Sequence, residues 1–163
     1  MNFKSKKGWL DYLYYRINKQ RDFALCGLFK LPDKEVRAAK WTSYHRAIFP
    51  VDYNEDWKLK NINQRQILPS EVVLDIETKE GINETIQKLK ERHIEHYVYD
   101  TGSRGVHISI FFDRDLNREE KERIIKTFGG DLQKSANITM IALEFTEHWK
   151  SGKKKEFYNG NSN

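Results

Sequence analysis

The feature that most constrains the fold of this chain is a regular succession of strand and helix patterns in its second half. Apolar residues at every second position predict strands, and apolar residues three or four positions apart predict helices. Ile82, Ile86 and Leu89 mark one helix, and the capping pair Asn117 and Glu120 starts another. The predicted order is strand 72–77, a helix around 82–89, strand 95–100, strand 106–112, helix 117–128 and strand 138–145.

This β-α-β-β-α-β order is typical of a ferredoxin-like or RRM-like sheet with both helices on one face. We therefore predict an α+β fold. The first part of the chain is less regular, and segment 21–26 is predicted either to continue a helix or to begin a short strand. The other elements expected there are helices 9–19 and 34–40, strand 44–49 and a polar loop at 51–70. The predicted organisation is an N-terminal α/β lobe with its connecting loop at 1–70, an RRM-like core at 71–150 and a basic, polar tail at 151–163, together forming one compact domain.

Composition narrows the possible partners and metals. Cys26 is the only cysteine, which excludes an internal disulfide and a zinc site built on several thiolates. The 29 basic and 24 acidic residues give a net charge of +5, compatible with a polyanionic partner. No run approaches the length of a membrane span, and the N-terminus lacks the apolar region of a signal peptide. We expect a cytoplasmic protein with no membrane association.

Strand parity predicts where the polar residues gather. Residues two apart in a strand share a face, so the apolar residues would face the helices while Asp75, Glu77, His107 and Glu144 face the other, open side. Each of them alone is more often a solvated or structural residue. In the ferredoxin-like order, however, their strands are neighbours, because the fourth strand pairs beside the first. Carboxylates brought together need a cation, and oxygen ligands without cysteine favour Mg²⁺ or Mn²⁺.

A turn from Thr101 to Gly105 leads into the strand that carries His107. A hairpin turn alone explains its glycines. It does not explain Ser103 and Arg104 at the rim of an acidic face. Turn amides, a hydroxyl and a guanidinium together suit phosphate oxygens.

At these residues the sequence resembles the archaeo-eukaryotic primase superfamily. The resemblance lies in the acidic pair Asp75-Ile76-Glu77, the following turn Ser103-Arg104-Gly105-Val106-His107 and the later acid Glu144. The stretch His148-Trp149-Lys150-Ser151-Gly152-Lys153 resembles the basic H-x-K-[ST]-G-K segment that often follows in this family. The match covers residues 71 to 154, and the D-x-E form is similar to plasmid and viral members.

The resemblance implies a DNA primase/polymerase-type nucleotidyltransferase that transfers nucleoside triphosphates to a 3′-hydroxyl on a single-stranded DNA template, with an accessory or large primase subunit as a possible partner. It implies that Asp75, Glu77 and Glu144 hold two Mg²⁺ or Mn²⁺ ions. It further implies that the triphosphate is bound by Ser103, Arg104 and His107, with Lys150 and Lys153 as additional phosphate or template contacts. The zinc-binding insert that the family often carries is excluded by the single cysteine.

Two other functions fit parts of the sequence. Leu74-Asp75-Ile76-Glu77-Thr78 matches the first motif of DEDD-type 3′–5′ exonucleases, but no clear late aspartate motif follows Asp113. A non-catalytic RRM-like protein would stack bases on aromatic residues such as Phe111. Acids at the positions where stacking residues belong argue against that alternative.

Overall fold

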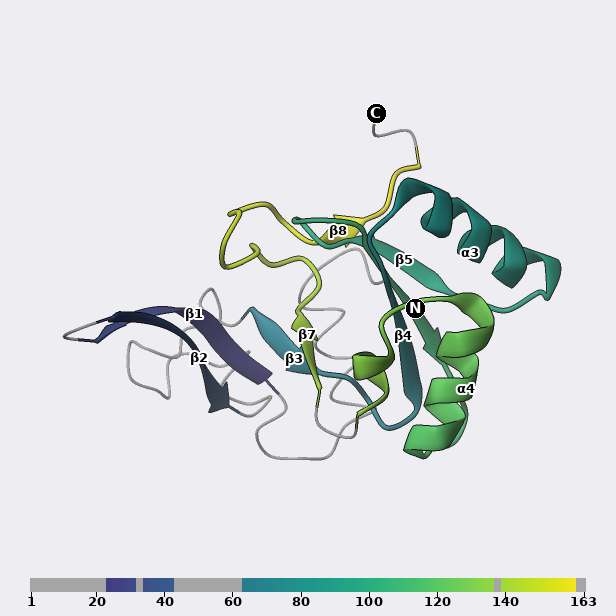
Figure 1. Ribbon diagram of the computed structural model, residues 1–163, viewed down its shortest axis with the longest axis horizontal. Coiled ribbons are helices and arrows are strands. Elements are labelled where there is room, and N and C mark those ends of the chain that lie inside the picture. Colours follow the sequence, from purple (N-terminus) through teal and green to yellow (C-terminus); the bar gives the residue numbers. More distant parts are fainter. Residues whose placement is uncertain (1–22, 32–33, 43–62, 137–138, 161–163) are drawn as a thin grey trace. The chain divides into compact units, whose positions relative to one another are not determined.

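The computed structural model of this chain describes residues 23–31, 34–42, 63–136 and 139–160, with side chains described from residue 63 onward. The chain divides into two compact units, each with a four-stranded sheet (Figure 1). The first unit comprises Met1–Gln66 and Ile141–Lys155, and the second comprises Ile67–Met140 and Glu156–Asn163. The described residues form an α+β protein, as predicted.

The second unit is built on an antiparallel sheet with strand order β4-β6-β5-β8. Helix α3 connects β4 to β5, and helix α4 follows β6 (Figure 1). The three strands and two helices predicted between residues 72 and 128 are thereby confirmed. Their bounds are β4 Glu71–Ile76, α3 Lys79–Glu91, β5 Tyr97–Asp100, β6 Val106–Phe111 and α4 Arg118–Phe128, with β8 at Glu156–Phe157.

One face of this sheet forms the hydrophobic core with both helices. Leu74 and Ile108 are register partners in the centre of the sheet, and both are fully buried. The strand parity predicted from the sequence is therefore confirmed for the core face. The buried cluster consists of Val72, Leu74 and Ile76 from β4, Val106, Ile108 and Ile110 from β6, and Ile82, Leu89, Leu116, Ile125 and Phe128 from α3, α4 and the connection before α4.

The opposite face is not the open surface that we predicted. Val73, Ser109 and Tyr99 on that face are all 0% exposed. Two polar side chains there are paired within the unit: the Ser109 hydroxyl donates to Glu71 Oε1 at 2.8 Å, and the Leu68 amide donates to Glu71 Oε2 at 3.1 Å. Parity identified which side chains share this face but did not reveal that the face is largely closed to solvent.

Side-chain caps define the beginning of both helices. Thr78 accepts a hydrogen bond from the Gly81 amide at the start of α3. Asn117 and Glu120 form the predicted capping box at the start of α4, each side chain bonding the other's backbone N–H. Gly129 ends α4 with φ of 105°, a conformation that glycine adopts without steric cost.

The sheet of the first unit has the order β2-β1-β3-β7. β1 (Phe23–Leu31) and β2 (Lys34–Thr42) pair along their whole length, with Leu31 opposite Lys34. The predicted helix 34–40 is therefore wrong, and strand is the correct alternative for the start of β1. Residues 34–40 form a strand because they pair with β1, and such tertiary pairing overrides a weak helix propensity.

Two further predictions about strands need correction. The predicted loop 51–70 contains β3 (Gln64–Gln66), and the predicted strand 138–145 is only β7 (Met140–Ala142). β7 lies beside β3 and not beside β4, so the fourth strand of the ferredoxin-like order is absent from the sheet of the second unit. The predicted helix 9–19 and strand 44–49 fall outside the described residues.

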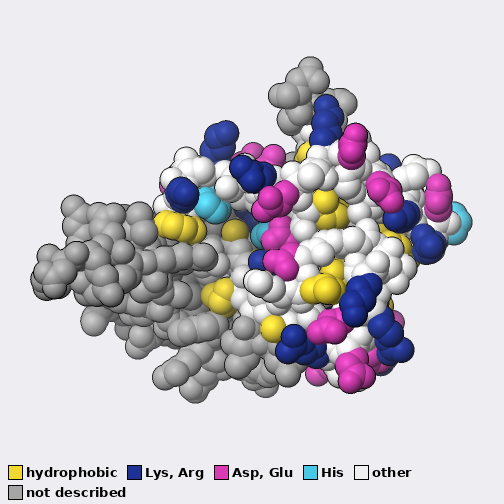
Figure 2. Space-filling model, viewed as in Figure 1, with side chains coloured by type: hydrophobic (Ala, Val, Ile, Leu, Met, Phe, Trp, Pro, Cys, Tyr) yellow, Lys and Arg dark blue, Asp and Glu magenta, His cyan; other side chains and the backbone are white. Residues whose placement is uncertain are grey.

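The length of the helices and the distribution of surface charge bear on whether the described residues contact a membrane or a polyanion. Among them, no helix is both long enough and apolar enough to cross a membrane. Acidic and basic side chains are interspersed over the visible face of α3 and α4 and do not gather into a patch of one sign (Figure 2). The net charge of the chain therefore does not point to a binding surface on these helices.

Candidate active site at the end of strand β4

The register between β4 and β6 brings Asp75 and His107 together. They are direct partners in the antiparallel ladder, and His107 Nε2 lies 3.7 Å from Asp75 Oδ2. The His107 side chain is 8% exposed and that of Asp75 is 21% exposed. Tyr99 of β5 is the register partner of His107 on its other side. The acidic pair and the histidine, which are separate motifs in the sequence, thus meet within the second unit.

Gly105 brings the turn that precedes His107 against the end of β4. Its φ is +74°, and a Cβ atom built there would lie 2.0 Å from the Ile76 carbonyl oxygen and 2.6 Å from Glu77 Cα. Only a residue without a side chain fits so close to another backbone. The glycine therefore has a packing role in addition to forming the turn.

Hydrogen bonds inside the turn fix its shape. The Thr101 hydroxyl donates to the Arg104 carbonyl at 3.0 Å and accepts from the Ser103 amide at 3.2 Å. Asp100 Oδ1 accepts from the Gly102 amide at 2.8 Å. Two amides that we expected to face phosphate oxygens are thus used within the turn. The groups that the turn presents are the exposed side chains of Ser103 and Arg104.

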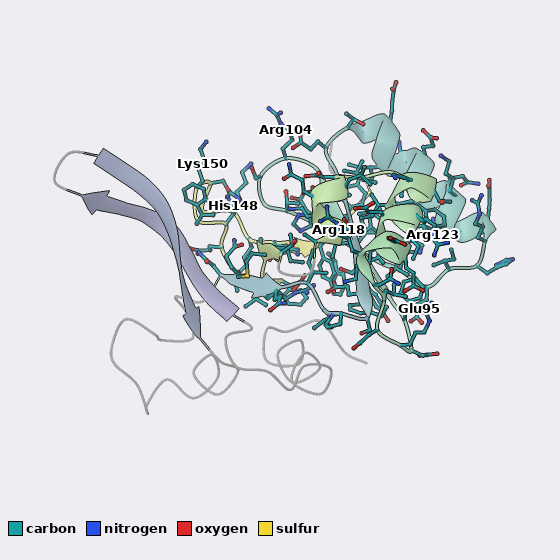
Figure 3. All side chains as sticks on the ribbon, turned by 60° about the horizontal axis from the view of Figure 1, so that its bottom comes forward. Glu95, Arg104, Arg118, Arg123, His148 and Lys150 are labelled. Carbon is teal, nitrogen blue, oxygen red and sulfur yellow. The ribbon has the colours of Figure 1, made fainter. Side chains whose placement is uncertain are left out.

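Glu77 and Arg104 form an open ion pair at the rim. Arg104 Nη1 lies 3.6 Å from Glu77 Oε2, and the two side chains are 79% and 63% exposed. Solvent screens such a pair strongly, so it holds neither partner tightly. Arg104 extends away from the ribbon (Figure 3). Breaking this ion pair therefore costs little free energy, and each side chain is available to bind a ligand instead.

The surroundings of Asp75 shift its pKa. Burial opposes its negative charge, but the hydrogen bond and charge of His107, together with the nearby ammonium of Lys134, outweigh burial and lower the pKa of Asp75 below its usual 3.8. Lys134 Nζ lies 3.3 Å from Asp75 Oδ2. Asp75 is therefore an ionised carboxylate at neutral pH, with the Lys134 ammonium and the His107 imidazole beside it.

Glu144, the third predicted metal ligand, belongs to the first unit and lies in a buried ion cluster there. Arg65 Nε and Nη2 donate to its two oxygens at 2.9 and 3.0 Å, and Lys155 Nζ donates to Oε1 at 2.7 Å. All three side chains are 0% exposed. Burial raises the pKa of Glu144, but the charges of Arg65 and Lys155 prevail and lower it to about 2. A metal ion at Glu144 would have to displace one of these cations.

The residues present fit a divalent ion at Asp75 and Glu77. Among the described residues there is no group of three or more His, Cys, Asp or Glu side chains placed to hold a metal. Mg²⁺, however, commonly uses one or two carboxylates and completes its shell with water and substrate phosphates. The two carboxylates of Asp75 and Glu77 match that requirement by their chemistry. The convergence of Glu144 with these residues stays a prediction.

Lys150 and Lys153 lie on a closed loop of the first unit. The His148 amide donates to the Lys153 carbonyl at 2.7 Å, and the Gly152 amide donates to the His148 carbonyl at 2.9 Å. His148 Nδ1 accepts from the amides of Lys150 and Ser151, each at 3.3 Å. Both lysine side chains are exposed at this loop (Figure 3 labels Lys150). These hydrogen bonds define the shape of the loop, and the phosphate contacts of Lys150 and Lys153 stay a prediction.

Sequence reasoning did not identify the three basic residues that pair with Asp75 and Glu144. Arg65 lay in a segment predicted as a polar loop, Lys155 in a lysine run interpreted as a solvated tail, and Lys134 carried no motif. No local pattern identified them, because the partners of Arg65 and Lys134 are far away in the chain and that of Lys155 is 11 positions away. Arg65 and Glu144, for example, are 79 positions apart.

Comparisons with known proteins give a structural likeness but no sequence match. No protein-family model matches the chain, and no curated protein sequence matches it. Among solved structures, the chain is similar to the polymerase domain from Mycobacterium tuberculosis ligase D in complex with DNA, with a TM-score of 0.48 and 8% sequence identity. The alignment covers 96% of this chain and 82% of that one. A likeness of this degree does not establish a shared function.

The packing of Gly105 can be tested by adding one methyl group. Gly105→Ala should cost several kcal/mol of stability, because the new Cβ would meet the Ile76 carbonyl in addition to the strained positive φ. Gly152→Ala is the matched control, since Gly152 has φ of +70° but no atom within 4 Å of its built Cβ. We expect about 1 kcal/mol for the control. Urea unfolding measures both, and equal losses would show that Gly105 serves the turn alone.

The ion cluster at Glu144 predicts a specific pH dependence of stability. The folded-state pKa of about 2 lies below the ordinary 4.5, so the contribution of Glu144 is complete above about pH 4.5 and is lost as the pH falls toward 2. Glu144→Gln should therefore cost about 3 kcal/mol at pH 7 and show a smaller further loss between pH 4.5 and 2.

The matched control is Glu147→Gln, because Glu147 is an exposed acid of the same unit. The unfolding free energy of this variant should equal that of the wild-type protein at pH 7 and between pH 4.5 and 2. If Glu144→Gln unfolds at the wild-type urea concentration at pH 7, the cluster does not stabilise the first unit.

Proposed function

We propose that this chain is a nucleotidyltransferase of the DNA primase/polymerase type, acting on nucleoside triphosphates and a single-stranded DNA template. The supporting observation is the meeting of two motifs at one end of β4. The β4–β6 register sets His107 beside Asp75, and Gly105 packs the Ser103-Arg104 turn against the backbone of Glu77. Acids for a metal and donors for a phosphate are thereby adjacent.

Asp75 and Glu77 would hold the divalent ion. When bound, such an ion lowers the pKa of an attacking 3′-hydroxyl and stabilises charge on the leaving pyrophosphate. Asp75 suits this role because its lowered pKa keeps it ionised, and Glu77 because its exposed carboxylate is only loosely paired. A second ion would need Glu144 as a further ligand, which requires the release of Arg65 or Lys155 from it.

The turn would bind the triphosphate. Arg104 offers a planar guanidinium that matches two phosphate oxygens at once, and it is exposed enough to leave Glu77 for them. Ser103 adds a hydroxyl from the same turn, and His107 adds an imidazole that Asp75 orients. Lys150 and Lys153 would contact template or triphosphate oxygens from their exposed loop. Priming in the cell would involve an accessory or large primase subunit.

The proposal predicts metal-dependent synthesis on a template. Incubation with Mn²⁺, labelled nucleoside triphosphates and single-stranded DNA should give labelled oligomers. Asp75→Asn, Glu77→Gln and His107→Ala should each reduce the product about 100-fold or more, because each removes a group at the charge-bearing centre of the reaction. Asp113→Asn is the control, since Asp113 is an exposed acid outside the proposed site.

The same assay separates the other two candidate functions. Shortening of the DNA from its 3′ end, again lost in Asp75→Asn, would identify an exonuclease. Metal-independent DNA binding with no synthesis or degradation would identify a non-catalytic binding protein. Full activity of both Asp75→Asn and His107→Ala would show that the reaction takes place elsewhere.

A further inference from the structure

Lys134 places a cation at the carboxylate that the proposed function assigns to a metal. Its Nζ lies 3.3 Å from Asp75 Oδ2, the same oxygen that faces His107 Nε2 at 3.7 Å. The side chain of Lys134 is only 18% exposed. Neither the sequence motifs nor the proposed mechanism uses this lysine.

The pairing is built into the fold of the segment after α4. Gly130 has φ of +125°, and a Cβ atom there would lie 3.2 Å from the Asp75 backbone nitrogen, so the chain runs directly against β4 at this position. The short helix η4 (Leu132–Ser135) follows. Asp131 caps it by accepting from the Gln133 amide at 2.9 Å, and the Lys134 amide donates to the Asp131 carbonyl at 3.1 Å.

The other end of η4 is also anchored. Ser135 is 0% exposed, and its hydroxyl lies within hydrogen-bond distance of the Leu132 carbonyl at 2.7 Å and of Glu122 Oε1 on α4 at 3.4 Å. Lys134 therefore extends from a backbone that is fixed on both sides of it. Its contact with Asp75 is not the chance placement of a long surface side chain.

Among the described residues of the second unit, this pair is less exposed than other ion pairs formed by lysine or arginine. The pairs of Arg104 with Glu77, Lys88 with Glu84, and Arg118 with Glu122 each have a basic side chain that is 38% exposed or more. In the pair of Lys134 with Asp75 both side chains are less than a quarter exposed. Solvent screens such a pair less, so the ammonium contributes more to keeping Asp75 ionised.

We propose that Lys134 is the resident counter-cation of Asp75, and that a divalent ion binds by displacing its ammonium group from Oδ2. This inference rests on the proposed role of Asp75 as a metal ligand. An ammonium group and a divalent ion repel each other, so an ion at Oδ2 disfavours the ammonium group there. Burying part of an ionised carboxylate without a cation beside it costs free energy of folding. Lys134 therefore stabilises the site whenever the metal is absent.

Displacement also links metal binding to triphosphate binding. Once it leaves Asp75, the Lys134 ammonium needs a new anionic partner close by, because a poorly solvated charge without one is unfavourable. The triphosphate carried by the metal supplies such oxygens. Metal and triphosphate should therefore bind together more favourably in the wild-type protein than in a variant that lacks this lysine.

The proposal reverses the usual expectation for a residue in an active site, because removing Lys134 should strengthen metal binding. The free Mn²⁺ signal in electron paramagnetic resonance measures affinity directly, without any activity. Lys134→Met should bind Mn²⁺ about tenfold more tightly than the wild-type protein. Lys134→Arg should bind like the wild-type protein, since it keeps the charge. Lys126→Met, at an exposed position of α4, controls for net charge and should change the affinity less than twofold.

Thermal unfolding gives a second readout. Lys134→Met should have a lower Tm than the wild-type protein in the absence of metal, and saturating Mn²⁺ should raise its Tm by more, because the ion then fills an uncompensated site. If Lys134→Met does not fold, Lys134→Gln replaces it in both measurements.

The outcomes separate this inference from the proposed function. Unchanged or weaker Mn²⁺ binding by Lys134→Met, together with loss of binding in Asp75→Asn, would overturn the role of Lys134 and leave the metal site in place. Wild-type affinity in Asp75→Asn, or no Mn²⁺ binding by the wild-type protein, would overturn the metal site itself.

Discussion

The pairing of β4 with β6 is the interaction on which the candidate site depends. Leu74 and Ile108 face each other in the core, both fully buried, and the next position along each strand carries Asp75 and His107. A slip of one residue would turn every side chain of a strand to the opposite face, so the apolar pattern fixes the register. Burial of Leu74 and Ile108 therefore determines that Asp75 meets His107, although neither of those polar residues contributes to the core.

The two buried or half-buried acids are held in different ways. Glu144 accepts three short hydrogen bonds from two cations and is 0% exposed, which is the arrangement of a structural ion cluster. Asp75 has the Lys134 ammonium at 3.3 Å and the His107 imidazole at 3.7 Å, and it retains access to solvent. Loose pairing leaves room for exchange with a ligand, whereas removing a partner from a fully buried cluster is strongly unfavourable. This contrast favours Asp75 over Glu144 as a ligand of the proposed metal ion.

Local patterns in the sequence were sufficient to predict much of the second unit. Its central strands, both helices, the capping box at Asn117 and the core face all follow from alternation, helical spacing and caps. Predictions failed where partners distant in the chain decide the structure. Residues 34–40 became a strand because β1 pairs with them, and the strand at Met140–Ala142 joined β3 instead of β4. Lys134 was missed for the same reason, since its partner Asp75 is distant from it in the chain.

The most direct test of a divalent metal site at the end of β4 is Mn²⁺-induced line broadening of backbone amide resonances, measured with a non-hydrolysable nucleoside triphosphate present. Paramagnetic broadening falls steeply with distance, so it locates the ion. We predict that the amides of Asp75, Glu77, Gly105, His107 and Lys134 lose intensity at the lowest Mn²⁺ concentrations. Strong broadening confined to other parts of the chain, with these five amides unaffected, would contradict the site proposed for this protein.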